Sequence, residues 1–242
     1  MINLEKYKGF AFFLLFLFIN LTNCELQSPE NETKVDYTGQ RGIIIDIDSN
    51  TYQTVGIGSQ IWMAENLATE HLNNGDLIPQ INNDSIWASP WNKQSGNCTY
   101  DNDSIYYKKS FGLLYNYYAV KTGALCPDGW HVPSKADWNT LFKFAGGSKI
   151  AGGKLKNMYS SLWEGTNYGF QETYDFNALP GGYRQFISGK FFDIGTGAYW
   201  WTADSVSYFQ AYSVSIQNSN TNIGIQVSSN RYGFNIRCIK NK

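Results

Sequence analysis

The chain has 242 residues, of which 17% are aromatic and 16% are charged, and its formal net charge is −1. Because 19 basic residues stand against 20 acidic ones, there is no basic excess to neutralise phosphates, and we predict no nucleic-acid partner. A hydrophobic content of 43% is too high for a disordered protein.

Residues 1–23 have the pattern of an export signal. Two lysines precede an apolar run, Phe10 to Ile19, which spans about 15 Å as a helix and matches a signal-peptide core rather than a membrane span. Cys24 follows, three residues after Leu21, as in the lipobox of bacterial lipoproteins, although Asn23 departs from the small residue usual there. We predict lipidation of Cys24; the alternative is an ordinary secretory signal with an incidental cysteine.

The segment after the signal is polar, and we expect residues 24–41 to form a flexible tether. Residues 42–242 then form one globular head. No other apolar run approaches the length of a membrane span. The expected location is the cell envelope, with the protein held at the outer membrane or cell surface by its lipid.

The cysteines indicate a disulfide rather than a metal site. There are four of them, with no CxxC pair and only two histidines in the chain, so we predict neither a bound metal nor a cofactor. In an oxidising compartment, three thiols remain if Cys24 is lipidated, which allows one bridge. We favour Cys126 with Cys238; the alternative pairs Cys98 with either of them.

The head has the texture of an α+β domain. Short runs bounded by turn residues predict strands at both ends, and two helices are expected between them. The polar stretch from Ala68 to Asn97 is expected to be a long surface excursion. The predicted strands are residues 42–46, 52–57, 60–63, 176–179, 183–187, 190–194, 199–202, 211–217, 223–228 and 233–239.

The two expected helices rest on different signals. Residues 111–120 lack proline, and lack glycine after Gly112, which suits a short buried helix. The second helix begins at Ser134, an N-cap with Asp137 at the third helical position. Apolar side chains at helical spacing follow from Trp138, and Gly146-Gly147 closes the helix.

Four stretches of the head together resemble one family, the Fibrobacter succinogenes major paralogous domain, which occurs in exported proteins and lipoproteins of Fibrobacter and Bacteroidota. The resemblance runs from about Ile43 to Lys240. The stretches are DSNTYQTVGIGSQIWMAENL (48–67), FGLLYNYYAV with CPDGWHVPS (111–120 and 126–134), GGKLK with FNALPGGYR and YWWT (152–156, 176–184 and 199–202), and GFNIRCI (233–239).

This resemblance implies a fold related to C-type-lectin-like domains and to formylglycine-generating enzymes, with short antiparallel strands around two helices. It implies no settled activity. The Glu-Pro-Asn or Gln-Pro-Asp loop and the Trp-Asn-Asp strand of calcium-dependent lectins do not occur, and neither does the cysteine arrangement of the enzymes. Asp46-x-Asp48-x-Asn50 resembles the start of an EF-hand but lacks its later glycine and glutamate, so we expect a turn.

Aromatic side chains are the best candidates for recognition. Trp87 and Trp91 lie in the polar excursion, outside any periodic core pattern. Trp200 and Trp201 are adjacent on a predicted strand, so they point to opposite faces and one of them is expected to face outward. Flat rings near Asn and Asp side chains suit the apolar face and hydroxyls of a sugar. These four tryptophans are the predicted ligand-binding residues.

The leading hypothesis is therefore a non-enzymatic, lipid-anchored surface protein whose head binds a glycan or another surface protein. No catalytic residue is predicted. One alternative is an extracellular enzyme that acts on polysaccharide or peptide with unrecognised carboxylates. The other is a structural component of the envelope.

Overall fold

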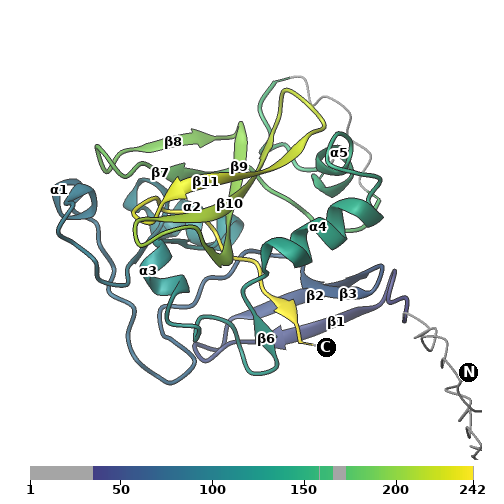
Figure 1. The fold of residues 1–242 in the computed structure, drawn as a ribbon, viewed down its shortest axis with the longest axis horizontal. Coiled ribbons are helices and arrows are strands. Elements are labelled where there is room, and N and C mark those ends of the chain that lie inside the picture. The colour runs from purple at the N-terminus through teal and green to yellow at the C-terminus, as the bar shows by residue number, and fades with distance from the viewer. Residues whose placement is uncertain (1–34, 158, 166–172, 242) are drawn as a thin grey trace, which may run out of the picture. The chain divides into compact units, whose positions relative to one another are not determined.

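A computed structural model describes residues 35–157, 159–165 and 173–241, so the predicted signal and Cys24 lie outside the described residues. Antiparallel strands and short helices give an α+β domain, as predicted (Figure 1). In this described part, no helix has both the length and the apolar character needed to cross a membrane.

One sheet contains strands from both ends of the domain. Its order is β1-β2-β3-β12-β6, and all of its pairs are antiparallel. The predicted strands at 52–57 and 60–63 form a hairpin, because β2 and β3 pair antiparallel with Ile57 opposite Gln60. Gly58 in its turn has φ +57°, a left-handed conformation that favours glycine. The strands are β1 (Arg41–Ile45), β2 (Thr51–Ile57), β3 (Gln60–Met63), β6 (Trp130–His131) and β12 (Ile239–Lys240).

The last residues of the expected tether are part of the fold. The Tyr37 N–H donates to the Gly58 carbonyl at 2.7 Å, and the Gly39 N–H donates to the Gly56 carbonyl at 3.1 Å. A Cβ on Gly56 would lie 1.8 Å from the Tyr37 carbonyl oxygen, so only glycine permits this approach. The ordered head therefore begins at least four residues before β1.

A second sheet has the order β11-β10-β9, and two two-stranded sheets complete the strands. The predicted strand at 233–239 has single bridges only at residues 233–235, including Phe234 to Tyr115, and regular pairing only from Ile239. The predicted strand at 176–179 holds only a bridge from Ala178 to Lys156. The strands are β4 (Asn97–Cys98), β5 (Leu114–Tyr115), β7 (Gly181–Arg184), β8 (Phe191–Ile194), β9 (Gly197–Ser205), β10 (Gln210–Gln217) and β11 (Ile223–Ser229).

The helix at Ser134 is confirmed together with its capping box. The Asp137 N–H donates to Ser134 Oγ at 3.2 Å, and the Ser134 N–H donates to the Asp137 carboxylate at 2.9 Å. More helices form than the two expected. They are α1 (Asp84–Ala88), η1 (Tyr100–Asn102), α2 (Ser104–Phe111), α3 (Tyr117–Val120), α4 (Lys135–Phe144) and α5 (Ala151–Leu155).

The expectation of one helix over residues 111–120 is wrong. Helix α2 ends at Phe111 because Gly112 has φ +70° and packs tightly, so that a Cβ there would lie 2.6 Å from the Leu67 carbonyl oxygen. Strand β5 follows, and Asn116 then caps the short α3 by accepting from the Ala119 N–H at 3.1 Å.

Both faces of β9 are buried, which decides where its tryptophans lie. Helix α4 packs between the two sheets, and its Trp138 contacts Trp200 with ring centroids 5.8 Å apart (Figure 1). Trp201 points to the other face and packs against Tyr117 and Phe234. The expectation that one of these two tryptophans faces outward is therefore wrong.

The predicted disulfide is present. Cys126 and Cys238 are bonded across a sequence separation of 112 residues and so tie β12 to the loop before β6. Cys98, the alternative partner, is a free and fully buried thiol in β4.

Candidate functional site

Three of the four candidate tryptophans are core residues. Trp87 is 3% exposed, and Trp200 and Trp201 are fully buried. Each indole N–H donates inside the protein: Trp87 to the Arg231 carbonyl, Trp200 to Asn66 Oδ1 and Trp201 to the Tyr115 carbonyl, at 2.7–2.9 Å. The expectation of a surface position for Trp87 is therefore wrong. Trp91 is 87% exposed, and its contact with a ligand stays a prediction.

A pocket of about 260 Å³ opens beside the second sheet, and it is lined mainly by aromatic rings. The rings of Tyr199, Phe234 and Tyr232 are stacked in a row, with centroids 5.5 and 5.1 Å apart and interplanar angles of 14° and 11°. Tyr183 meets all three edge-on. We call this the aromatic pocket; its lining is Tyr183, Tyr199, Gln226, Val227, Ser228, Tyr232 and Phe234.

Strand register explains why these residues meet. Tyr199 in β9 lies opposite Ser215 in β10, and Gln226 in β11 lies opposite Ser213. Because side chains two apart on a strand share a face, Gln226 and Ser228 lie on the same face as Tyr199. Phe234 and Tyr232 come from the segment before β12 and cover that face.

The lining of the aromatic pocket is uncharged but rich in hydrogen-bonding groups. Burial raises the pKa of the Tyr183 and Tyr232 hydroxyls. Burial and a hydrogen bond to Asp193 raise that of Tyr199. All three phenols therefore stay protonated at neutral pH. The Tyr199 hydroxyl already donates to Asp193 and accepts from Gln217, so the phenols of Tyr183 and Tyr232 are the ones that can donate to and accept from a ligand. Such a pocket can stack against an apolar surface and hydrogen-bond neutral hydroxyls or amides.

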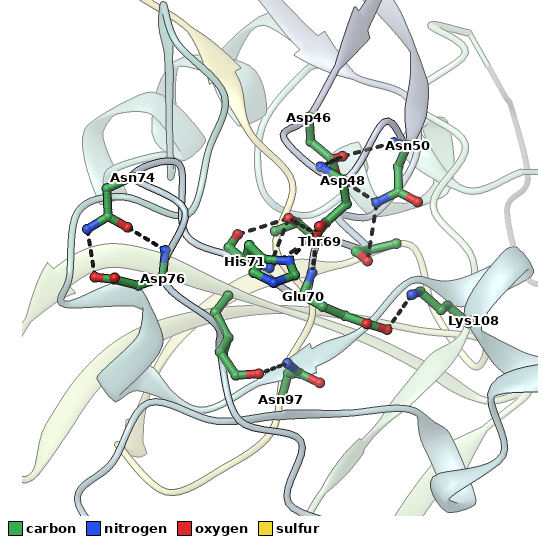
Figure 2. Close-up of polar contacts among 12 residues, drawn as sticks. Asp46, Asp48, Asn50, Thr69, Glu70, His71, Asn74, Asp76, Asn97 and Lys108 are labelled. Carbon is green, nitrogen blue, oxygen red and sulfur yellow. Dashed lines mark hydrogen bonds and ion pairs between the residues drawn. The ribbon is translucent and has the colours of Figure 1, made fainter.

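A polar cluster lies on another part of the domain, where the Asp46–Asn50 turn meets the start of the excursion (Figure 2). Asp48 Oδ1 and His71 Nδ1 are 2.6 Å apart. Asp48 Oδ2 accepts from Thr69 Oγ1 at 2.7 Å and from the N–H groups of Glu70 and His71 at 2.6 and 3.1 Å. The cluster joins residues more than 20 positions apart.

The electrostatics of Asp48 fit a structural clamp. Burial raises the pKa of this carboxyl, but the hydrogen bonds from Thr69, Glu70 and His71 outweigh it and lower the pKa to about 2. Asp46 likewise accepts from the N–H groups of Asp48 and Asn50 at 2.9 Å. The predicted turn is confirmed. Across the described residues, no group of three or more His, Cys, Asp and Glu side chains is placed to hold a metal ion.

A second hollow of about 380 Å³ lies near the disulfide. Asn73 and Asn74 of the excursion line it together with Trp130 and Asn241, and Asn73 Nδ2 donates to Asp128 Oδ1 at 2.6 Å. Two residues of the excursion thus border this hollow. No residue of the excursion lines the aromatic pocket.

A comparison with known protein families shows to which family the domain belongs. The model of the Fibrobacter succinogenes major domain matches residues 55–240, more than half of the chain. The chain belongs to this family. No curated protein and no solved structure matches it.

The aromatic pocket lies wholly inside the Fibrobacter succinogenes major domain, whereas Asp46 and Asp48 precede the matched residues. The pocket is thus built by the domain itself. Tyr183, Tyr199 and Tyr232 are not among the residues predicted from the sequence to bind a ligand, and Tyr199 enters the prediction only within the YWWT stretch. The alternation within β9 and within β11 could be read from the sequence. It shows that Tyr199 and Gln226 share a face of the sheet only once the pairing of both strands with β10 is known.

Proposed function

We propose that this protein is a lipid-anchored protein of the cell envelope whose Fibrobacter succinogenes major domain is a non-catalytic binding head, and that the head binds carbohydrate in the aromatic pocket. The observation that carries the proposal is the lining of that pocket. The buried rings of Phe234 and Tyr199 form its base, and the half-buried rings of Tyr183 and Tyr232 offer apolar surface. The Gln226 side chain and the phenols of Tyr183 and Tyr232 offer uncharged donors and acceptors.

These features suit a sugar better than a charged metabolite. A pyranose ring presents C–H groups on one face and hydroxyls around its edge, so it needs both kinds of surface at once. The Ser228 hydroxyl is held by a contact to the Ser213 hydroxyl at 2.8 Å, whereas Gln226 is exposed and its side-chain amide has no hydrogen bond among those found in the described residues. Gln226 is therefore available to a ligand.

The fold itself supports a related inference. We infer a relation to C-type-lectin-like domains, in which strands from the two ends of the domain share a sheet. Here β1 and β12 lie in one sheet, and the Cys126–Cys238 bond secures the C-terminal strand. A solved structure of any member of the family, compared with lectin-like domains by strand order, tests this relation.

Binding is tested with immobilised glycans and the exported protein. Tyr232→Ala should weaken binding about tenfold, which is about 1.4 kcal/mol, because it removes one of the stacked rings. Gln226→Ala leaves the rings in place and should also weaken binding. Tyr159→Ala is the matched control, since that tyrosine is 85% exposed and lies outside the pocket. Equal binding by all four proteins would contradict the proposal.

The anchor is tested separately. Cys24→Ser should abolish labelling of the protein with palmitate in cells, because the thiol is the expected acceptor. Cys98→Ser is the control and should leave labelling intact, since this thiol is buried. Continued labelling of the Cys24 variant would refute the anchor without affecting the proposed binding.

A further inference from the structure

Next to the aromatic pocket lies an exposed surface on which aromatic rings and lysines meet. Tyr208 and Phe209 stand at the tip of the β9–β10 hairpin, 59% and 62% exposed, with ring centroids 4.8 Å apart. The ammonium groups of Lys93 and Lys121 lie 5.0 and 5.5 Å from the centre of the Tyr208 ring. We call these four residues, with the exposed Trp91 two positions before Lys93, the lysine–aromatic surface.

The two lysines converge without a negative partner. Lys93 Nζ donates to the Tyr208 hydroxyl at 3.4 Å, and in the described part of the chain neither lysine forms an ion pair. Two ammonium groups gathered on one ring repel each other, and a bound anion removes that repulsion. The chain as a whole has a net charge of −1, so the positive charge of this surface is a local feature.

One short turn connects this surface to the aromatic pocket. The Asn230 N–H donates to the Phe209 carbonyl at 2.9 Å, and Asn230 Nδ2 donates to the Tyr208 carbonyl at 2.9 Å. Two residues later, Tyr232 lines the pocket. Between them, Arg231 Nη1 donates to the Ala88 carbonyl at 2.6 Å, which fixes the turn. These hydrogen bonds thus fix the position of the lysine–aromatic surface relative to the aromatic pocket.

The aromatic pocket has a volume of about 260 Å³, which is below the usual range for small-molecule sites, roughly 300–1,000 Å³. If a polysaccharide binds there, only a small part of it fits in the pocket, and its neighbouring sugars lie on the surface outside. We propose that the ligand is an acidic polysaccharide whose carboxylate or sulfate groups bind Lys93 and Lys121 while a neighbouring sugar occupies the aromatic pocket. This inference rests on the proposed function. It adds the charge class of the glycan and a second contact region.

The test uses the full-length protein in detergent micelles and two immobilised forms of one polymer. These are polygalacturonate and the same polymer with its carboxylates methyl-esterified. The wild-type protein should bind the acid form at least about tenfold more tightly at low salt, and added salt should reduce the difference. The double variant K93Q/K121Q should lose the preference and keep its binding to the ester.

Two exposed lysines on other elements give a matched control, because K143Q/K149Q removes the same charge far along the chain. This control should keep the preference for the acid form. Equal binding of the two polymers by the wild type, or equal losses in the two double variants, would overturn the inference. So would absence of binding to polygalacturonate, or lysine-dependent binding only to phosphatidylglycerol nanodiscs, which would assign the surface to membrane contact.

The two proposals fail separately in this design. Tyr232→Ala should reduce binding to both polymers, because it alters the pocket and not the lysines. Unchanged binding of the ester by this variant refutes the pocket as the sugar site. The lysine variants then still decide whether negative charge is recognised.

Discussion

At the scale of single residues, Asp48 shows how one carboxylate can hold in place a segment that has no regular secondary structure. The residues that donate to it, Thr69, Glu70 and His71, belong to a segment without regular secondary structure. The N–H groups of Glu70 and His71 donate to its carboxylate, as they would donate to the carbonyls of a neighbouring strand in a sheet. The excursion therefore starts from a fixed point on the Asp46–Asn50 turn (Figure 2).

We expect Asp48→Asn to lower the free energy of unfolding by about 1–3 kcal/mol, since the amide group that replaces one carboxylate oxygen cannot accept the same bonds. Asp76→Asn is the control, because that exposed carboxylate bonds only the Asn74 side chain. Urea unfolding at neutral pH measures both. Equal small losses would show that Asp48 is not a clamp.

The same residue gives a pH dependence. Its pKa falls from an ordinary 3.8 to about 2 on folding, so the folded state favours the charged form. The stabilisation is fully present above pH 3.8 and is lost as the pH falls through about 2. Unfolding free energies measured from pH 6 down to pH 2 should therefore converge for the wild type and Asp48→Asn. A constant gap across that range would contradict this origin.

At the scale of elements, helix α4 shows what the sequence could predict. Its signals are local: Ser134 and Asp137 cap it, and Trp138 starts its apolar face, all within a few positions. The supposed helix at 111–120 failed because its decisive feature is not local. Gly112 ends α2 where the backbone of Leu67 approaches, and no neighbouring residue in the sequence reveals that approach.

Removing the cap should destabilise the domain measurably. Ser134→Ala deletes the side chain that accepts from the Asp137 N–H, which typically costs about 1 kcal/mol. In a domain of this size, we expect the melting temperature to fall by about 2–4 °C. Thr140→Ala is the control, since its hydroxyl only donates to the Ala136 carbonyl within the same helix. A similar fall for both variants would argue against the cap.

At the scale of the whole molecule, the aromatic pocket could not be predicted because it depends on strand pairing. Tyr183, Tyr199 and Tyr232 come from three segments, and each looks like ordinary core material in its own stretch of sequence. The disulfide and the hairpin at Gly58 were predictable, because few cysteines and strong turn residues leave few arrangements. Trp87 was mistaken for a surface residue because the segment around it has no periodicity.

The Cys126–Cys238 bond joins residues 112 positions apart, so it constrains the unfolded chain strongly. We expect C126S/C238S to lose up to about 4–5 kcal/mol of unfolding free energy. Dithiothreitol should have the same effect on the wild type and none on the double variant, as urea unfolding will show. Stability unaffected by reduction would mean that the C-terminal strand is secured by packing alone.

Cys98 is a free thiol, which matters for the oxidising compartment proposed for this protein. Its sulfur is fully buried beside Trp87, and burial raises its pKa to about 12, so almost no thiolate exists in the folded state. Thiol–disulfide exchange requires a thiolate that can reach its target. Native Cys98 therefore does not react with the Cys126–Cys238 bond, and it can form a wrong disulfide only before the domain has finished folding.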